Sequence, residues 1–214
     1  MKKVAKIQKP KFIDDLEIIN DIYEEIISQE KIQNKLIENI TIEDKNDIGL
    51  TIDSCVFKNV IFDNCAFKNV DLLDSKFENC DLSNIDFTGG LINRVEFINC
   101  KLVGARFDEA SLKDVLFENV SAKYSNFSFA RFKGINIVES NFQDSTFQEI
   151  KHEKMYLKYV DLTNAYFNKT SLSKINLTTC DISGIDIQIK DLEGAIVTPV
   201  QGLDLTRLMG LVIE

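Results

Sequence analysis

Five cysteines and one histidine are the residues of this sequence best suited to metal binding or nucleophilic chemistry. Zinc sites and reactive thiols usually bring cysteines together as Cys-x-x-Cys pairs or place them near histidines, and this sequence has no such pair. The single histidine, His152, has no serine, cysteine or second ligand at a spacing typical of catalysis. No glycine-rich phosphate loop appears either. We therefore predict a protein that is not an enzyme and that has no metal and no cofactor.

The cysteines are instead separated by multiples of five residues, which points to a structural role. Apolar residues occupy every fifth position from Ile52 to Leu192, and only His152 interrupts them. The cysteines lie two residues before members of this series, where a thiol acts as a small hydrophobe. Cys80 and Cys100 are close enough in this arrangement for a disulfide in principle, but a reducing compartment favours free thiols. We interpret all five as core residues: Cys55, Cys65, Cys80, Cys100 and Cys180.

A period of five fits neither an α-helix, with 3.6 residues per turn, nor a flat strand, with a period of two. Two inward residues followed by three outward ones describe a short extended segment and a turn of about a quarter circle. Four such segments make a square coil of about twenty residues, and the coils stack at about 4.8 Å. The sequence thus predicts an all-β solenoid. Because the register never shifts between residues 52 and 192, we expect no loop to project from its walls.

The repeat is clearest at Cys80–Asn84, Val160–Asn164 and Cys180–Gly184. These motifs resemble the repeat of the pentapeptide-repeat family, whose members fold as a right-handed quadrilateral β-helix. In Asn93–Phe97, Leu112–Glu118 and Gly210–Ile213, the chain is similar to the quinolone-resistance (Qnr-type) proteins of that family, in particular the chromosomal kind from Gram-positive bacteria. This resemblance implies a DNA-mimicking protein that binds DNA gyrase or topoisomerase IV and protects it from quinolones. The alternative is an interaction scaffold for an unrelated protein partner.

Three segments are expected along the chain: an N-terminal cap (1–49), the β-helix (50–194) and a C-terminal segment (195–214). Between Leu16 and Ile27, apolar residues recur at helical spacing, which favours a short amphipathic helix covering the first coil. Isoleucines between 32 and 42 could begin the coil early, but Asp47 breaks the series, so we expect the regular repeat to start near residue 50.

The C-terminal segment has the signals of a helix and of a short strand after it. Thr198, Pro199 and Gln201 form a capping-box pattern, and Gly210 is placed to end the helix. An apolar strand at the open end of a solenoid is a pairing surface, and a two-fold dimer closes it most simply. We expect a homodimer, in agreement with the head-to-head dimers of the family. Its predicted interface consists of Leu205, Leu208, Met209, Leu211, Val212 and Ile213.

Residues twenty apart share one face of the predicted coil, so charges can be assigned to faces. Acidic residues outnumber basic ones on two adjacent faces, which we take as the partner-facing acidic column. Five aromatic residues also fall at outward positions, where they could anchor a partner or be ordinary exposed rings. The acidic residues are Asp63, Asp81, Asp144, Asp161, Asp181, Asp86, Asp108, Glu109 and Glu149, and the aromatic ones are Tyr124, Phe129, Tyr156, Tyr159 and Tyr166.

The formal net charge of −9 opposes direct nucleic-acid binding, which depends on cationic contacts to phosphate. Seven coils at about 4.8 Å would make a rod of about 34 Å, and a head-to-head dimer would be about twice as long. An acidic rod of that size suits a protein groove that normally holds DNA. No apolar stretch is long enough to span a membrane, and the basic start lacks the apolar core of a signal peptide. We therefore expect no membrane contact and a cytoplasmic protein.

Overall fold

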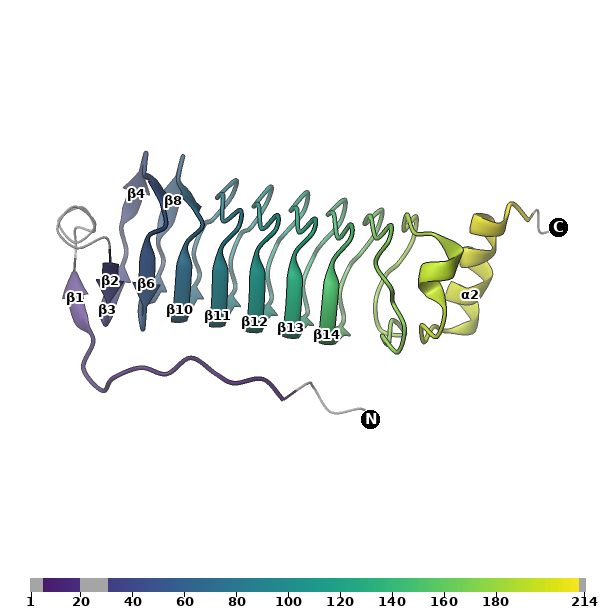
Figure 1. The fold of residues 1–214 in the computed structure, drawn as a ribbon, viewed down its shortest axis with the longest axis horizontal. Helices are drawn as coiled ribbons and strands as arrows, with labels where there is room; N and C mark the ends of the chain where they lie inside the picture. Colours follow the sequence, from purple (N-terminus) through teal and green to yellow (C-terminus); the bar gives the residue numbers. More distant parts are fainter. Residues whose placement is uncertain (1–5, 20–30, 212–214) are drawn as a thin grey trace.

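The computed structural model describes residues 6–19 and 31–211, which form a single parallel β-solenoid closed at one end by a short helix (Figure 1). The short strands of the first coils are β1 (Glu17–Ile19), β2 (Lys31–Gln33), β3 (Lys35–Glu38), β4 (Thr41–Glu43), β5 (Asn46–Ile48), β6 (Thr51–Asp53), β7 (Val56–Lys58), β8 (Ile61–Asp63) and β9 (Ala66–Lys68). The long strands are β10 (Asp71–Glu78), β11 (Leu91–Ile98), β12 (Ser111–Glu118), β13 (Arg131–Val138) and β14 (Lys151–Lys158). They are followed by 3-10 helix η1 (Ile189–Leu192), helix α2 (Pro199–Leu205) and 3-10 helix η2 (Thr206–Met209).

From β2 onward, strands pair in parallel with partners twenty residues away. Asp71 pairs with Leu91, Leu91 with Ser111 and Ser111 with Arg131. On the walls without long strands, isolated parallel bridges keep the same spacing from Ile61 to Asp186. The predicted solenoid is therefore confirmed, and so is the expectation that no loop interrupts its walls between residues 52 and 192, all of which the structure describes.

The core consists of columns of large side chains, one from each coil. The Phe57 and Phe77 rings stack with their centroids 4.7 Å apart, and the column continues through Phe97. A second column contains Phe107 and Phe127, with centroids 4.8 Å apart. Stacked rings bury a large apolar area and add their own contact energy, so these columns hold the coils in register. The five cysteines are free and buried among them, as predicted.

Each corner of the coil is turned by one residue with a positive φ angle. These residues recur every five positions from Asn34 to Lys174, and asparagine, aspartate and glycine are frequent among them. This left-handed conformation is easiest for glycine and is tolerated by asparagine and aspartate. On one corner, asparagine side chains also hydrogen-bond from coil to coil, as from Asn59 Nδ2 to Asn39 Oδ1 at 2.9 Å. The polar part of the repeat therefore builds the corners.

The N-terminal region differs from the expectation in two ways. The coil starts at Lys31, about twenty residues earlier than predicted, because β2 pairs with β6 and β3 with β7. The expected helix is wrong where it can be compared, since Glu17–Ile19 form strand β1 and pair with β3. The rest of that predicted helix, residues 20–30, lies outside the described residues.

The residues before β1 form an extended arm, 6–16, that runs back along the outside of the solenoid (Figure 1). The Lys11 backbone N–H donates to Asp74 Oδ1 at 3.0 Å, and Ile7 lies beside Gly134. Gly134 has a positive φ of 72°, and a Cβ there would lie 3.4 Å from Ile7. The arm therefore lies along the corner formed by residues 74, 94, 114 and 134.

The C-terminal cap follows the predicted signals. Thr198 caps α2 in a capping box with Gln201, and Pro199 is the first helical residue. Gly210 ends η2 with a φ of 69°. Gln201 also donates to the carbonyl oxygens of Leu177 and Cys180, which ties the helix to the last complete coil. The predicted terminal strand cannot be compared beyond Leu211, because residues 212–214 lie outside the described residues.

Candidate protein-docking surface

The outward aspartates of the repeat first serve the turn in which they lie. Asp81 Oδ1 accepts hydrogen bonds from the Ser83 backbone N–H and hydroxyl, at 3.1 and 2.6 Å. Asp161 and Asp181 bond to the residue two positions later in the same way. This is the local side-chain-to-backbone bonding that favours turns. One oxygen of each carboxylate is used in this way, and the second faces outward.

The carboxylate charges of Asp81 and Asp86, in the N-terminal half of the predicted column, are neutralised. Asp81 pairs with Lys101 at 3.1 Å, and Asp86 lies 3.6 Å from both Lys68 and Arg106. Burial would raise the pKa of Asp81, but the Ser83 hydrogen bonds and the Lys101 ammonium hold it below its ordinary value. Among the other predicted acids, Asp108 pairs with Arg106 and Glu149 with Lys169.

The remaining predicted acids form no ion pair within the described chain. Burial would raise the pKa of Asp161, but its hydrogen bonds and the charge of Lys123 lower it. Asp161 and Asp181 lie on adjacent coils of the same wall, joined by a parallel bridge, while Lys101, Ser121 and Asn141 separate them from Asp81. Asp161 Oδ2 accepts from the neutral Gln143 side chain at 2.5 Å. Three acids of the C-terminal half, Asp144, Asp161 and Asp181, are therefore without an ion pair in the described part of the chain, which the sequence pattern did not reveal. No ion pair to another described residue is formed by Asp63, Glu109, Asp144, Asp161 or Asp181.

The outward aromatic residues divide into two groups. Tyr156 and Tyr166 are half-buried on the walls, whereas Tyr124, Phe129 and Tyr159 are 63%, 51% and 55% exposed. The three exposed rings all occupy corners with positive φ, at 59°, 63° and 54°. Lys158 covers the Tyr159 ring, with its ammonium 4.9 Å from the ring centroid. Tyr124 and Phe129 make no such contact within the described chain.

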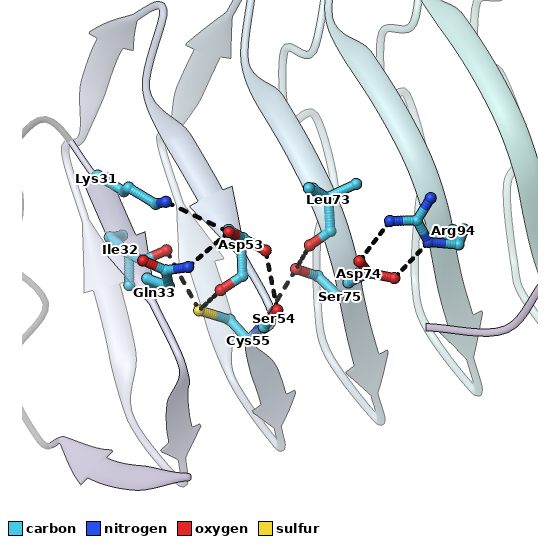
Figure 2. A network of polar contacts seen from close by, with 10 residues as sticks. All are labelled: Lys31, Ile32, Gln33, Asp53, Ser54, Cys55, Leu73, Asp74, Ser75 and Arg94. Atoms are coloured by element: carbon cyan, nitrogen blue, oxygen red, sulfur yellow. Dashed lines mark hydrogen bonds and ion pairs between the residues drawn. The ribbon is translucent and has the colours of Figure 1, made fainter. Parts of the chain in front are cut away.

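The arm corner carries a strong ion pair. Figure 2 shows Asp74 on β10 paired with Arg94 on β11, and the two hydrogen bonds measure 2.6 and 2.5 Å. Burial would raise the pKa of Asp74, but Arg94 and the Lys11 backbone N–H lower it below its usual range. Nearby, Asp53 accepts a hydrogen bond from Gln33 and pairs with Lys31. This corner is occupied within the chain and is therefore a poor docking face.

The C-terminal cap leaves an apolar surface open at the end of the rod. Val200, Leu203, Met209 and Leu211 are 77%, 56%, 61% and 54% exposed. Of the predicted dimer residues, Leu205 and Leu208 instead pack partly buried against the core, because they close the last coil. Val212 and Ile213 lie outside the described residues. The exposed Val200 and Leu203 were not among the predicted residues, although their spacing on α2 could have identified them.

The groups considered for chemistry have structural roles. His152 is half-buried, and its Nε2 lies 2.5 Å from the Ser171 carbonyl oxygen. Because a carbonyl oxygen only accepts, Nε2–H donates this hydrogen bond. Burial raises the pKa of the Cys55 thiol to about 11, which makes it a poor nucleophile. Residues 6–19 and 31–211 contain no cluster of three histidine, cysteine, aspartate or glutamate side chains that could hold a metal. Within the same ranges, no helix is long and apolar enough to cross a membrane.

Comparison with known proteins identifies the repeat. Residues 70–141 match the family described as "Pentapeptide repeat region", and residues 154–186 match "Pentapeptide repeats (8 copies)". No curated protein sequence matches the chain significantly.

The solved structures similar to this chain include the following three proteins. A trypsin-treated form of QnrB1, a plasmid-mediated fluoroquinolone resistance protein, is 16% identical, covers 84% of this chain and 99% of its own, and has a TM-score of 0.48. HetL from Nostoc sp. strain PCC 7120 is 14% identical, with 83% and 94% coverage and a TM-score of 0.37. A protein from the Arabidopsis thaliana thylakoid lumen is 22% identical, with 49% and 66% coverage and a TM-score of 0.35.

Proposed function

Because this chain belongs to the pentapeptide-repeat family, we propose that it acts by binding another protein and carries out no catalysis. The proposed partner is DNA gyrase or topoisomerase IV in the cytoplasm. The chain occupies the groove that otherwise holds DNA and so opposes poisoning of the enzyme by quinolones. The resemblance of Asn93–Phe97, Leu112–Glu118 and Gly210–Ile213 to the Qnr-type proteins supports this choice of partner.

The observation that carries the proposal is a straight acidic rod, with no loop between residues 52 and 192, on which several carboxylates form no ion pair. The chain has a net charge of −9, and Asp144, Asp161 and Asp181 form no ion pair with a described residue. A cationic groove attracts such a surface and increases the association rate. The arm lies on the corner diagonally across from Asp144, so it leaves these walls open.

Shape contributes more than charge to the proposed mimicry. Duplex DNA carries one charge per about 1.7 Å of its axis. The walls of this rod carry fewer, because Lys101 and Arg106 neutralise Asp81, Asp86 and Asp108. Binding should therefore depend less on salt than the binding of DNA does.

A second candidate function is an interaction scaffold for an unrelated protein. Ion pairs within the acidic column, such as Asp81 with Lys101, favour this function, because they remove negative charge that a full DNA mimic would need. A scaffold would bind its partner outside any DNA-binding site, so DNA would not compete with the scaffold for the partner.

We also propose that the chain forms a homodimer through its C-terminal cap. Val200, Leu203, Met209 and Leu211 support this arrangement, since they expose apolar surface at the end of the rod beside the core. Two caps joined end to end would bury these side chains and make one longer rod, which would extend farther along a DNA groove.

Competition binding tests the proposed function. Purified protein is immobilised and titrated with DNA gyrase and with topoisomerase IV, with and without a duplex DNA fragment. The proposal predicts binding to at least one enzyme that weakens as DNA is added. Binding that DNA leaves unchanged would favour the scaffold, and the lack of any binding would contradict a topoisomerase partner.

A further inference from the structure

Two exposed aromatic residues lie at successive corners of one coil in the middle of the rod. Tyr124 and Phe129 have φ angles of 59° and 63°, a conformation that bulky residues rarely adopt. Elsewhere on the Tyr124 corner, the chain has glycine, asparagine and aspartate, as at Asn84, Gly104 and Asp144, whereas the Phe129 corner also carries Glu109 and Glu149. Backbone strain of this kind persists where the surrounding structure enforces it, and it is frequent at functional sites.

The fold gains nothing visible from the two rings. They are 63% and 51% exposed, and neither appears among the stacked or cation-covered rings of the described chain. Either residue could be replaced by asparagine without loss of a core contact, since the core position between them belongs to Phe127, which is fully buried. Their size and apolar character are therefore available for a partner.

The wall between the two corners is rigid. Asn126 Oδ1 accepts from the Ser128 backbone N–H and hydroxyl at 2.9 and 2.7 Å. Ser125 Oγ donates to the Ala122 carbonyl at 2.7 Å, and Asn126 also bonds to Asp108 from the preceding coil. The wall that carries the two rings therefore loses little conformational freedom on binding, which favours affinity.

The surroundings of the rings indicate the chemistry of the partner. Glu109 and Glu149 occupy the same corner as Phe129 in the coils before and after it. Asp144 occupies the same corner as Tyr124 in the coil after it. Glu109 and Asp144 form no ion pair with a described residue, whereas Glu149 pairs with Lys169. An aromatic face flanked by carboxylates suits a guanidinium group, which stacks on the ring and bonds to carboxylate oxygens.

We propose that the wall bounded by Tyr124 and Phe129, with Glu109, Asp144 and Glu149 beside it, docks a protein surface that presents arginine side chains. The two rings are the anchors, and the carboxylates select guanidinium groups. The wall adjoins the corner diagonally across from the arm, so it is open along its length. The inference deepens the proposed function and rests on it for the identity of the partner, because a DNA-binding groove is lined by such cations.

The arginine chemistry can be tested without a topoisomerase. The ¹⁵N-labelled protein is titrated with an acetylated tri-arginine amide and, as a matched control, with the same peptide containing citrulline. The largest arginine-specific amide shifts are expected at residues 104–110, 124–130 and 144–150, and they should disappear in Phe129→Asn. Equal shifts with citrulline, or shifts centred on another wall, would overturn the inference.

A second experiment measures the binding of three variants to gyrase. Tyr124→Asn and Phe129→Asn should each weaken binding about tenfold, as expected for interface anchors. Tyr159→Asn is the control, because Tyr159 is also an exposed corner ring but is covered by Lys158. It should bind as the unaltered chain does, and none of the three should lower the melting temperature. Equal gyrase binding by all variants would overturn the inference and leave the proposed function intact. If the unaltered chain does not bind gyrase, the proposed function fails, and the peptide titration decides this inference alone.

Discussion

The two oxygens of each wall aspartate have different tasks. One holds the turn, as Asp161 Oδ1 does for Thr163, and the other can bond to a side chain, as Asp161 Oδ2 does to Gln143. Asparagine does the first task equally well, since Asn126 and Asn176 make the same bonds to Ser128 and Thr178. The preference of the repeat for aspartate or asparagine thus follows from the turn, while the choice between them determines the surface charge.

This division predicts that charge can be removed without damage to the fold. Changing Asp144, Asp161 and Asp181 together to asparagine should alter the free energy of unfolding by less than about 1 kcal/mol. Positions 161 and 181 keep their turn bonds, and an asparagine at 144 can still accept the hydrogen bond from Asn164. Gyrase binding should weaken about tenfold and become less dependent on salt. Asp81→Asn is the matched control, since Lys101 already neutralises that carboxylate. Equal losses in both proteins would contradict a special role of the unpaired acids.

Acid unfolding tests the buried carboxylate of Asp74. Its pKa in the folded chain lies below the value of about 3.9 expected for an unfolded chain, so the pair with Arg94 stabilises the fold above that pH. The stabilisation is lost as the pH falls through the lower folded pKa. Asp74→Asn should lower the free energy of unfolding at pH 7 by about 2–3 kcal/mol and flatten its decline below about pH 4. Urea unfolding from pH 2.5 to 7 measures both, and an unchanged slope below pH 4 would contradict this role.

At the scale of secondary-structure elements, stability comes from contacts between coils. The backbone hydrogen bonds between strands and bridges go to residues about twenty positions away, as from Phe62 to Asp81. A defect in one coil therefore weakens both neighbours, as expected for a repeat structure whose units contact only those beside them.

A ring in the middle of a column should show this coupling. Phe107 is fully buried and lies between Phe87 and Phe127, with centroids 5.5 and 4.8 Å away. Phe107→Ala should lower the free energy of unfolding by about 4 kcal/mol, since it leaves a cavity in the stack. Phe129→Ala serves as the exposed control and should change it by less than about 1 kcal/mol. Chemical denaturation measures both variants, and equal effects would contradict the stacked-core account.

The period of five predicted the elements wherever the inward residues are apolar. It failed before residue 50 because Lys35 and Lys45 occupy inward positions and Asp47 an axial one. Lys35 is accommodated by Glu17, whose carboxylate lies 2.7 Å from its ammonium, and this long-range pair has no signal in the local pattern. The arm escaped prediction for the same reason, because its anchor on Asp74 is 63 residues away. On the candidate surface, the sequence assigned the acids to faces of the coil, and the structure places Glu109, Asp144 and Glu149 at corners. The coil-to-coil ion pairs that neutralise some of the acids depend on side-chain geometry, which the pattern does not contain.

At the scale of the whole molecule, the two ends of the rod differ. The C-terminal end exposes an apolar cap, and the proposed dimer would cover it. Leu203→Asp with Met209→Asp should convert the dimer to a monomer, because the two carboxylates would be buried without partners. Sedimentation velocity measures the change. Ile48→Asp, at the most exposed isoleucine near the other end, is the control and should leave the dimer intact. A monomer in the unaltered chain would contradict the proposed assembly.

We propose that this acidic rod protects a topoisomerase from quinolones, and a supercoiling assay tests this proposal. DNA gyrase is inhibited with ciprofloxacin, and the purified protein is added over a range of concentrations. The account predicts that supercoiling recovers at protein concentrations below those that inhibit gyrase in the absence of the drug. Recovery should be reduced in the variant with Asp144, Asp161 and Asp181 changed to asparagine. If supercoiling neither recovers with the drug nor declines without it at high protein concentration, the account is contradicted.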